Sequence, residues 1–192
     1  MIFELRTYDL KPGKAPVYLD FFRTFGVGLV TRHLPMGGYW MVETGRLNRI
    51  EHLWIYADME ERDACRASLV KDRAWMEDFI PRAFADVTGQ SNRFMALERS
   101  SDRLDAVIGT RREARQNEDA ASPLFAGGLN SLSLSGMPLA GDGILGAFRI
   151  VSGQEPGKHV TLRSGDFRTL TTQGGDLAWH EIIRPLALSP LA

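Results

Sequence analysis

Two short β-type runs separated by a turn lie between Gly38 and Tyr56, and they restrict the possible folds more than any other stretch does. The runs cover about Tyr39–Thr44 and Arg49–Tyr56. The residues between them, Gly45–Asn48, include the glycine and the asparagine that tight hairpin turns prefer. The stretch therefore predicts a β-hairpin at the centre of a sheet.

The segments on either side of this hairpin predict a ferredoxin-like unit. Alternating residues predict a strand over Ile2–Tyr8, and apolar residues at helical spacing follow from Lys14 to about His33. Asp58 is followed three residues later by Glu61, which is the spacing of a capping box at the start of a second helical segment. A last strand is predicted near residues 93–99, so the first hundred residues read β-α-β-β-α-β. This order is typical of an α+β fold with a four-stranded antiparallel sheet and both helices on one face.

Alternation also assigns the side chains of the strands to two faces. The smaller apolar set is expected to face the helices: Phe3, Leu5, Leu53 and Ile55. The other face is then expected to point at a second sheet, and it carries Glu4, Arg6, Tyr8, His52, Trp54 and Tyr56. A single sheet cannot bury residues this large, so a second sheet must come from another chain or from the other half of this one.

The rest of the chain predicts a linker and a shortened second unit. Residues 101–122 are charged and read as a linker or a short helix, after a first domain at 1–100. Residues 123–192 are rich in Gly, Ser, Leu and Thr and hold short β-like runs. The spacing of Gly38 and Gly45 recurs at Gly146 and Gly153, and His159 follows as His52 does. We interpret residues 123–192 as a degenerate second copy.

Composition excludes several classes of protein. The formal net charge of -1 gives no electrostatic case for binding nucleic acid or an anionic membrane surface. Cys65 is the single cysteine, which excludes an intrachain disulfide and a cysteine-rich zinc site. The sequence shows no signal or transit pattern and no apolar run of about 20 residues. A cytoplasmic protein without membrane contact is expected.

Histidine, arginine and glutamate on one predicted face are the candidates for chemistry. His52 is either a general base or ligand contact, or a structural histidine bonded to Glu4, Glu43 or a tyrosine. Arg6 and Glu4 are either an ion pair or part of a ligand site. The four histidines are too dispersed to predict a metal site, and the phosphate-binding and hydrolase motifs are missing, so neither metal nor cofactor is expected.

Several segments in a fixed order resemble the NIPSNAP family, which belongs to the dimeric α+β barrel superfamily. They are FELRTYDLKPGK, GYWMVETGRLNRIEHLWIY, ERDACRASL and DRAWMEDF. The resemblance covers residues 2–99, and the final IIRPLALSPL is similar to the end of two-domain bacterial members. It implies two four-stranded sheets that face each other and close a barrel, with room for a small ligand between them. Superfamily relatives include cofactor-independent monooxygenases, degradation enzymes and haem-binding proteins.

Three functions remain open from the sequence. The first is a homodimer or higher homo-oligomer that binds a small hydrophobic or aromatic molecule between facing sheets. The second is a cofactor-independent monooxygenase or isomerase, with His52 as base or hydrogen-bond donor and Arg6 stabilising an oxyanion. The third is an assembly module whose inward face is only an interface. The residues expected to line the ligand site are Glu4, Tyr8, Trp40, Trp54 and Tyr56.

Overall fold

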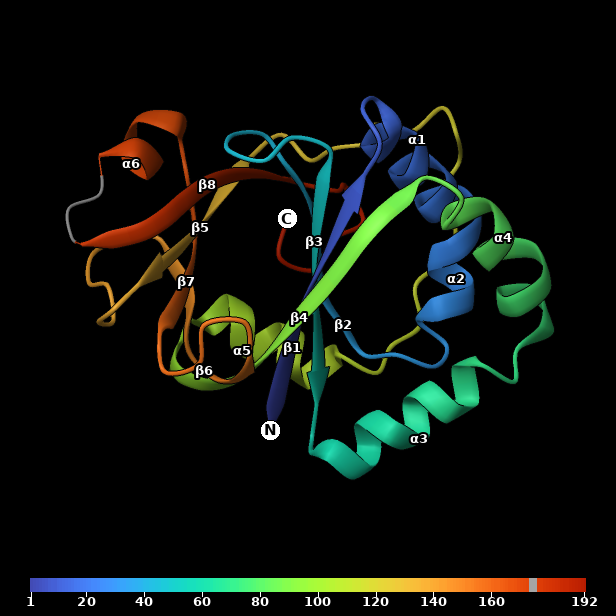
Figure 1. Ribbon diagram of the computed structural model, residues 1–192, viewed down its shortest axis with the longest axis horizontal. Coiled ribbons are helices and arrows are strands. Elements are labelled where there is room, and N and C mark those ends of the chain that lie inside the picture. Colours follow the sequence, from blue (N-terminus) through green and yellow to red (C-terminus); the bar gives the residue numbers. More distant parts are fainter. Residues whose placement is uncertain (173–175) are drawn as a thin grey trace.

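The computed structural model describes residues 1–172 and 176–192, and its centre is a closed barrel of antiparallel strands (Figure 1). Its strands are β1 (Ile2–Leu10), β2 (Met36–Val42), β3 (Arg49–Tyr56), β4 (Val87–Ser100), β5 (Leu129–Ser135), β6 (Ile144–Gly153), β7 (His159–Gly165) and β8 (Leu177–Pro185). The mixed α/β class and the antiparallel pairing predicted from the sequence are confirmed. The predicted hairpin is β2–β3, in which Tyr39 pairs with His52.

The helices lie mostly in the first half of the chain. They are α1 (Lys14–Phe21), the π-helical η1 (Phe22–Gly26), α2 (Val27–Val30), α3 (Met59–Leu69), the π-helical η2 (Ala74–Phe79), α4 (Ile80–Ala83), α5 (Asp102–Thr110) and α6 (Phe167–Thr171). The side chain of Asp58 accepts a hydrogen bond of 2.8 Å from the backbone N–H of Glu61, so the predicted cap of α3 is confirmed.

One chain closes the barrel, which answers a point that the sequence leaves open. The strands follow each other around it in the order β1-β3-β2-β8-β5-β7-β6-β4. The pairings β2–β8 and β4–β6 join the first hundred residues to the later ones. Figure 1 shows α1 to α4 on one side of β1 and β3, and β5 to β8 on the other side.

Two hydrophobic cores lie on opposite sides of the first four strands, and they correct the predicted facing of the sheet. Tyr8, Trp54 and Tyr56 pack with residues of the helices. Phe3 and Leu5 pack instead with residues of β5 to β8, inside the barrel. The sequence pattern predicted the opposite assignment of these two sets. Alternation groups residues by face correctly, but it does not identify the side on which each face is covered.

The size of the interior explains why the smaller residues point inward. An eight-stranded barrel leaves space that side chains just fill, so aliphatic residues suit it. Trp40 is an exception, because its ring folds over Gly38, where an added Cβ would lie 2.0 Å from the indole. The indole Nε1 of Trp40 donates a 3.0 Å hydrogen bond to Oδ1 of Asn130. Trp40 therefore links the two halves inside the barrel.

The later half carries less helix than the first. Residues 136–143 connect β5 to β6, and α6 is five residues long. Within 101–122, where a linker or short helix is expected, α5 is followed by an extended stretch that returns to the first half. There the guanidinium of Arg23 donates to the backbone carbonyls of Asp119, Ala120 and Ser122 at 2.9, 2.9 and 3.0 Å. The stretch is thus bound to the helical layer.

Candidate functional site

Four of the predicted site residues meet in a crevice between the sheet and the helices. Arg6 and Tyr8 come from β1, and His52 and Trp54 come from β3. The register places Arg6 directly opposite His52, so that these side chains emerge on the same face. Alternation along the strands predicted this grouping, but the group was expected to face a second sheet and not the helices.

His52 lies at the centre of this crevice with one ring nitrogen occupied and one free. Its side chain is 2% exposed, and Nε1 of Trp54 donates a 2.7 Å hydrogen bond to its Nδ1. An indole N–H can only donate, so Nδ1 must accept. The proton of a neutral His52 is therefore on Nε2, which is buried and has no hydrogen-bond partner among the described residues.

Burial holds His52 in its neutral form. Loss of solvation lowers its pKa well below the usual value, and the positive charges of Arg6 and Arg66 lower the pKa further, against a smaller opposite effect of Glu4. The neutral ring offers an Nε2–H donor to the crevice. This geometry favours the donor role over that of a general base, because the available lone pair, on Nδ1, already accepts from Trp54.

Aromatic rings form the walls around His52. The ring of Tyr39 stacks on the imidazole with centroids 4.8 Å apart, and the ring of Tyr8 meets it edge-on at 4.6 Å. The hydroxyls of Tyr18 and Tyr39 are 3.1 Å apart and share a hydrogen bond. Burial raises the pKa of both phenols, so both remain protonated at neutral pH.

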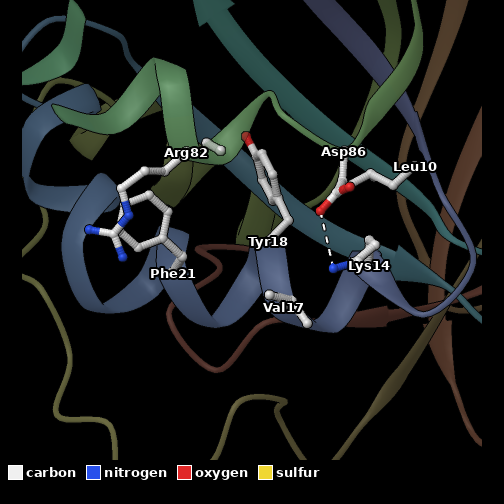
Figure 2. A pocket seen from close by; sticks show the side chains of 8 residues that line it. Leu10, Lys14, Val17, Tyr18, Phe21, Arg82 and Asp86 are labelled. Atoms are coloured by element: carbon white, nitrogen blue, oxygen red, sulfur yellow. Dashed lines mark ion pairs between the residues drawn. The ribbon is translucent and has the colours of Figure 1, made fainter. Parts of the chain in front are cut away.

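A tyrosine separates the crevice from a pocket at the surface. The crevice holds a free volume of about 20 Å³, which is enough for one water molecule. Tyr18 lines both this crevice and an outer pocket of about 160 Å³ between α1 and α4. Figure 2 shows the outer pocket, with Lys14 paired to Asp86 at one end and the guanidinium of Arg82 over the ring of Phe21 at the other.

Two π-helical segments shape the helical wall of the crevice. Phe22 in η1 stacks on Tyr39 with ring centroids 4.2 Å apart, and Trp75 in η2 also lines the crevice. The two segments pack closely at Gly26, where an added Cβ would lie 2.3 Å from the ring of Phe79. Single π turns inside helices occur frequently at functional sites.

Beside the crevice, Glu4 anchors the ion pairs that join the sheet to α3. Its carboxylate is fully buried and accepts hydrogen bonds of 2.9 to 3.1 Å from Arg6, Arg62, Arg66 and Asn92. Burial alone would raise the pKa of Glu4, but the bond from Arg62 and the charge of Arg66 outweigh it and lower the pKa to about 2. These ion pairs hold α3 against β1.

The first half of the chain matches a known protein family. The NIPSNAP family model matches residues 3–101, just over half of the chain. The chain belongs to the NIPSNAP family. It is 46% identical to NipSnap homolog 3B of Mus musculus over 79 residues, which are 41% of this chain and 32% of that protein. It is 38% identical to human NipSnap homolog 3A over 98 residues, 50% of this chain and 39% of that protein. The match thus spans about a third of the length of these relatives.

Solved structures match either the NIPSNAP half or the whole chain. The NIPSNAP protein Atu4242 from Agrobacterium tumefaciens is 33% identical, with a TM-score of 0.51, and the match covers 53% of this chain and 98% of that one. An anthrone oxidase-like protein is 7% identical, with a TM-score of 0.58 over 98% of this chain and 93% of that one. The second likeness shows that the fold of the whole chain is shared.

Three of the predicted ligand-site residues lie outside the crevice of this NIPSNAP chain. Trp40 points to the other side of the sheet, into the barrel. The carboxylate of Glu4 is occupied by its arginine partners. Tyr56 is buried next to the helices but does not line the crevice. Trp40 does not share the crevice with His52, because Tyr39, and not Trp40, pairs with His52 across the hairpin.

Three crevice residues of the NIPSNAP chain were missed from the sequence. Tyr39 could have been found from the hairpin register, since a residue and its cross-strand partner share a face. Tyr18 lies in the predicted first helix, but helical spacing alone does not show which of its residues points at His52. Trp75 lies in the second predicted helical segment, and it lines the crevice from η2.

The described part of the NIPSNAP chain shows neither a metal-binding cluster nor a membrane-spanning helix. No group of three or more His, Cys, Asp or Glu side chains is placed to hold a metal ion among residues 1–172 and 176–192. None of the helices within these ranges has the length and apolar character that crossing a bilayer requires.

Proposed function

We propose that the chain binds a small hydrophobic or aromatic molecule in the helix-side crevice, with the Nε2–H of His52 donating to an oxygen of that molecule. The observation that carries the proposal is the buried, unpartnered Nε2 among aromatic walls. A buried donor without a partner costs about 1–3 kcal/mol. A ligand oxygen would recover this energy, while its apolar part would pack against Tyr8 and Tyr39.

Binding needs more room than the closed crevice holds, and Tyr18 is placed to supply it. Its ring lies between the volume of about 20 Å³ and the outer pocket of about 160 Å³. Rotation of this ring, with loss of its hydrogen bond to Tyr39, would join the two spaces. The ligand then enters between α1 and α4 and reaches His52.

Titration with p-cresol and toluene tests this proposal, because the two differ by the hydroxyl group. We expect the chain to bind p-cresol about tenfold more tightly than toluene, as one hydrogen bond of about 1.4 kcal/mol requires. His52→Phe keeps a ring but loses the donor, so it should remove this preference. His159→Phe, a matched change at the histidine of β7, should keep it. Equal affinity for both compounds in the unchanged chain would refute the proposal.

A second candidate is catalysis on the bound molecule by a cofactor-independent monooxygenase. The observation in its favour is the whole-chain fold likeness to an anthrone oxidase-like protein, together with a buried donor that could stabilise an oxyanion. Anthrone is the probe: its carbonyl oxygen would accept from His52, and O₂ would convert it to anthraquinone and water. Oxygen uptake that His52→Phe abolishes would support catalysis, and uptake equal to the rate without protein would reject it.

We also propose the finer organisation predicted from the sequence. A ferredoxin-like unit at 1–100, a linker or short helix at 101–122 and a shortened, degenerate second copy at 123–192 are supported by the matching strand orders β4-β1-β3-β2 and β8-β5-β7-β6. A cytoplasmic homodimer or higher homo-oligomer is the proposed assembly. Because the barrel closes within one chain, a partner would bind its outer surface, and native mass spectrometry would give the subunit number. A chain that binds neither cresol nor toluene would favour the assembly module instead.

A further inference from the structure

A second pocket lies at one end of the barrel, on the other side of the sheet from His52. Its volume is about 450 Å³, within the range of small-molecule sites. Strands β1, β3 and β4 supply part of its lining, and β8, the β2–β3 turn and the β6–β7 connection supply the rest. Its lining includes the charged or hydroxyl-bearing side chains of Thr7, Asp9, Arg46, Arg49, Glu51, Arg93 and Glu181.

The carboxyl groups of this pocket differ in how they are neutralised. Asp9 has two close cations, since Nε of Arg46 lies 3.1 Å and Nε of Arg49 lies 2.9 Å from its Oδ1. Glu51 is 2% exposed and accepts a 2.8 Å hydrogen bond from the hydroxyl of Thr7. No arginine or lysine within the described ranges forms an ion pair with Glu51.

Arg93 is the least satisfied cation of the pocket. It is 6% exposed, and its Nη2 reaches Glu155 at 3.4 Å, which is long for a charge-assisted bond. Its Nε is buried and lacks a hydrogen-bond partner in the part of the chain that the structure describes. The guanidinium also lies 5.7 Å from the centroid of the Trp179 ring. A buried guanidinium with unused donors is suited to an anion.

We propose that the barrel-end pocket binds a small organic monocarboxylate, whose oxygens accept from Arg93 and from the protonated carboxyl of Glu51 while its carbon chain packs on Trp179. The carboxylate gives the unused Nε–H of Arg93 a hydrogen-bond partner. A dianion such as phosphate fits less well, because Asp9 and Glu181 also line the pocket. An organic cation would meet Arg49 and Arg93.

Glu51 is neutral near physiological pH, which makes it a donor. Burial raises its pKa to about 8, against the smaller lowering effects of Thr7, Arg93 and Arg49. Glu181 of β8 raises the pKa further, and burial raises the pKa of Glu181 as well. Asp9 of β1 and Arg46 of the β2–β3 turn also line this pocket. Ionised Glu51 would repel the ligand, so affinity should fall about tenfold per pH unit above pH 8.

Butyrate and butylamine test the charge preference, because they share a four-carbon chain. Both are titrated into the full chain at pH 6.5 and pH 9.5, and binding is followed by the indole N–H signal of Trp179 in NMR spectra. Butyrate should bind at pH 6.5 and weaken at least tenfold at pH 9.5. Butylamine should not bind at either pH. Tighter binding of butylamine than of butyrate would overturn the proposal.

Substitutions of Glu51 and Arg93 test whether these two residues bind butyrate. Glu51→Gln keeps a neutral donor, so butyrate should bind equally at the two pH values. Arg93→Gln should weaken butyrate at least tenfold, and Arg93→Lys serves if that variant does not fold. Arg149→Gln is the control, because Arg149 pairs with Glu98 outside the pocket. Butyrate binding that the Arg93 variants leave unchanged would contradict the proposal. His52→Phe should not alter butyrate binding, which separates this site from the crevice.

Discussion

Glu51 and His52 are neighbours in β3, yet they belong to the two different sides of the sheet. Each is 2% exposed. Burial raises the pKa of Glu51 to about 8 and lowers the pKa of His52 well below its usual value. Both side chains are therefore held neutral at pH 7, for the same physical reason: loss of water disfavours the charged form of either group.

The surroundings of the two residues make them different sites. His52 is enclosed by aromatic rings and offers a single directed donor. Glu51 is surrounded by arginines and carboxyl groups, and its protonation changes the net charge of its pocket. The helix side is thus suited to an apolar molecule with one oxygen. The barrel end is suited to a charged molecule whose binding depends on pH.

Replacing Glu51 by Gln should give the largest effect on stability, and the effect should grow as the pH rises from 4.5 to about 8. The folded pKa of about 8 exceeds the ordinary value of 4.5, so the stability gained from protonated Glu51 is complete below pH 4.5 and is lost as the pH rises to about 8. Glu51→Gln avoids this loss, on the order of 4 kcal/mol at pH 9. Urea unfolding of both proteins at pH 4 and pH 9 measures it. If both proteins lost the same stability between pH 4 and pH 9, folding would not raise the pKa of Glu51.

Glu4 should show the opposite pH dependence on the helix side. Its pKa of about 2 lies below the ordinary 4.5, so its stabilising contribution is present above pH 4.5 and is lost as the pH falls toward 2. Glu4→Gln should therefore cost about 3 kcal/mol at pH 7. The difference should shrink toward pH 2. Urea unfolding at pH 7 and pH 3 tests this, and a constant difference would mean that the arginine cluster does not depend on the charge.

The sequence predicted which residues share a face of the sheet, but it did not predict which face the helices cover. Alternation in β1 and β3 grouped Arg6, Tyr8, His52 and Trp54 correctly, since a strand repeats every two residues. It could not tell which side the helices cover, because both faces of the sheet are buried and both carry apolar residues. The limited space inside the barrel decides which face of the sheet points inward.

The barrel-end pocket was beyond prediction for a different reason. Thr7, Glu51 and Arg93 lie on three strands, and Glu181 comes from the half of the chain whose strands were poorly defined by pattern. Alternation along β3 places Glu51 on the same face as Leu53 and Ile55, but nothing local shows that a glutamate on that face is neutral. Its environment forms only when β2 pairs with β8 and β4 pairs with β6.

Substitutions of the two tryptophans of the hairpin should each affect only the face of the sheet on which that tryptophan lies. Trp40→Phe loses the hydrogen bond to Asn130 in the barrel, and Trp54→Phe loses the bond to Nδ1 of His52. Each should cost about 1–3 kcal/mol in urea unfolding. Only Trp54→Phe should change the ¹⁵N signals of His52, because it frees Nδ1 to carry the proton. An altered His52 tautomer in Trp40→Phe would show that the faces are not independent.

The smallest effect is expected at the hydroxyl of Thr7, which donates to Oε2 of Glu51. This bond favours ionised Glu51, so Thr7→Val should raise the pKa of Glu51 above about 8 by roughly half a unit to one unit. The ¹³C signal of the Glu51 carboxyl would report the shift. Tyr39→Phe, which removes a hydroxyl on the helix side, is the matched control and should leave that pKa unchanged. A lower pKa in Thr7→Val would mean that the hydroxyl accepts a proton from neutral Glu51 instead of donating to it, and the donor of the pocket would then already be occupied.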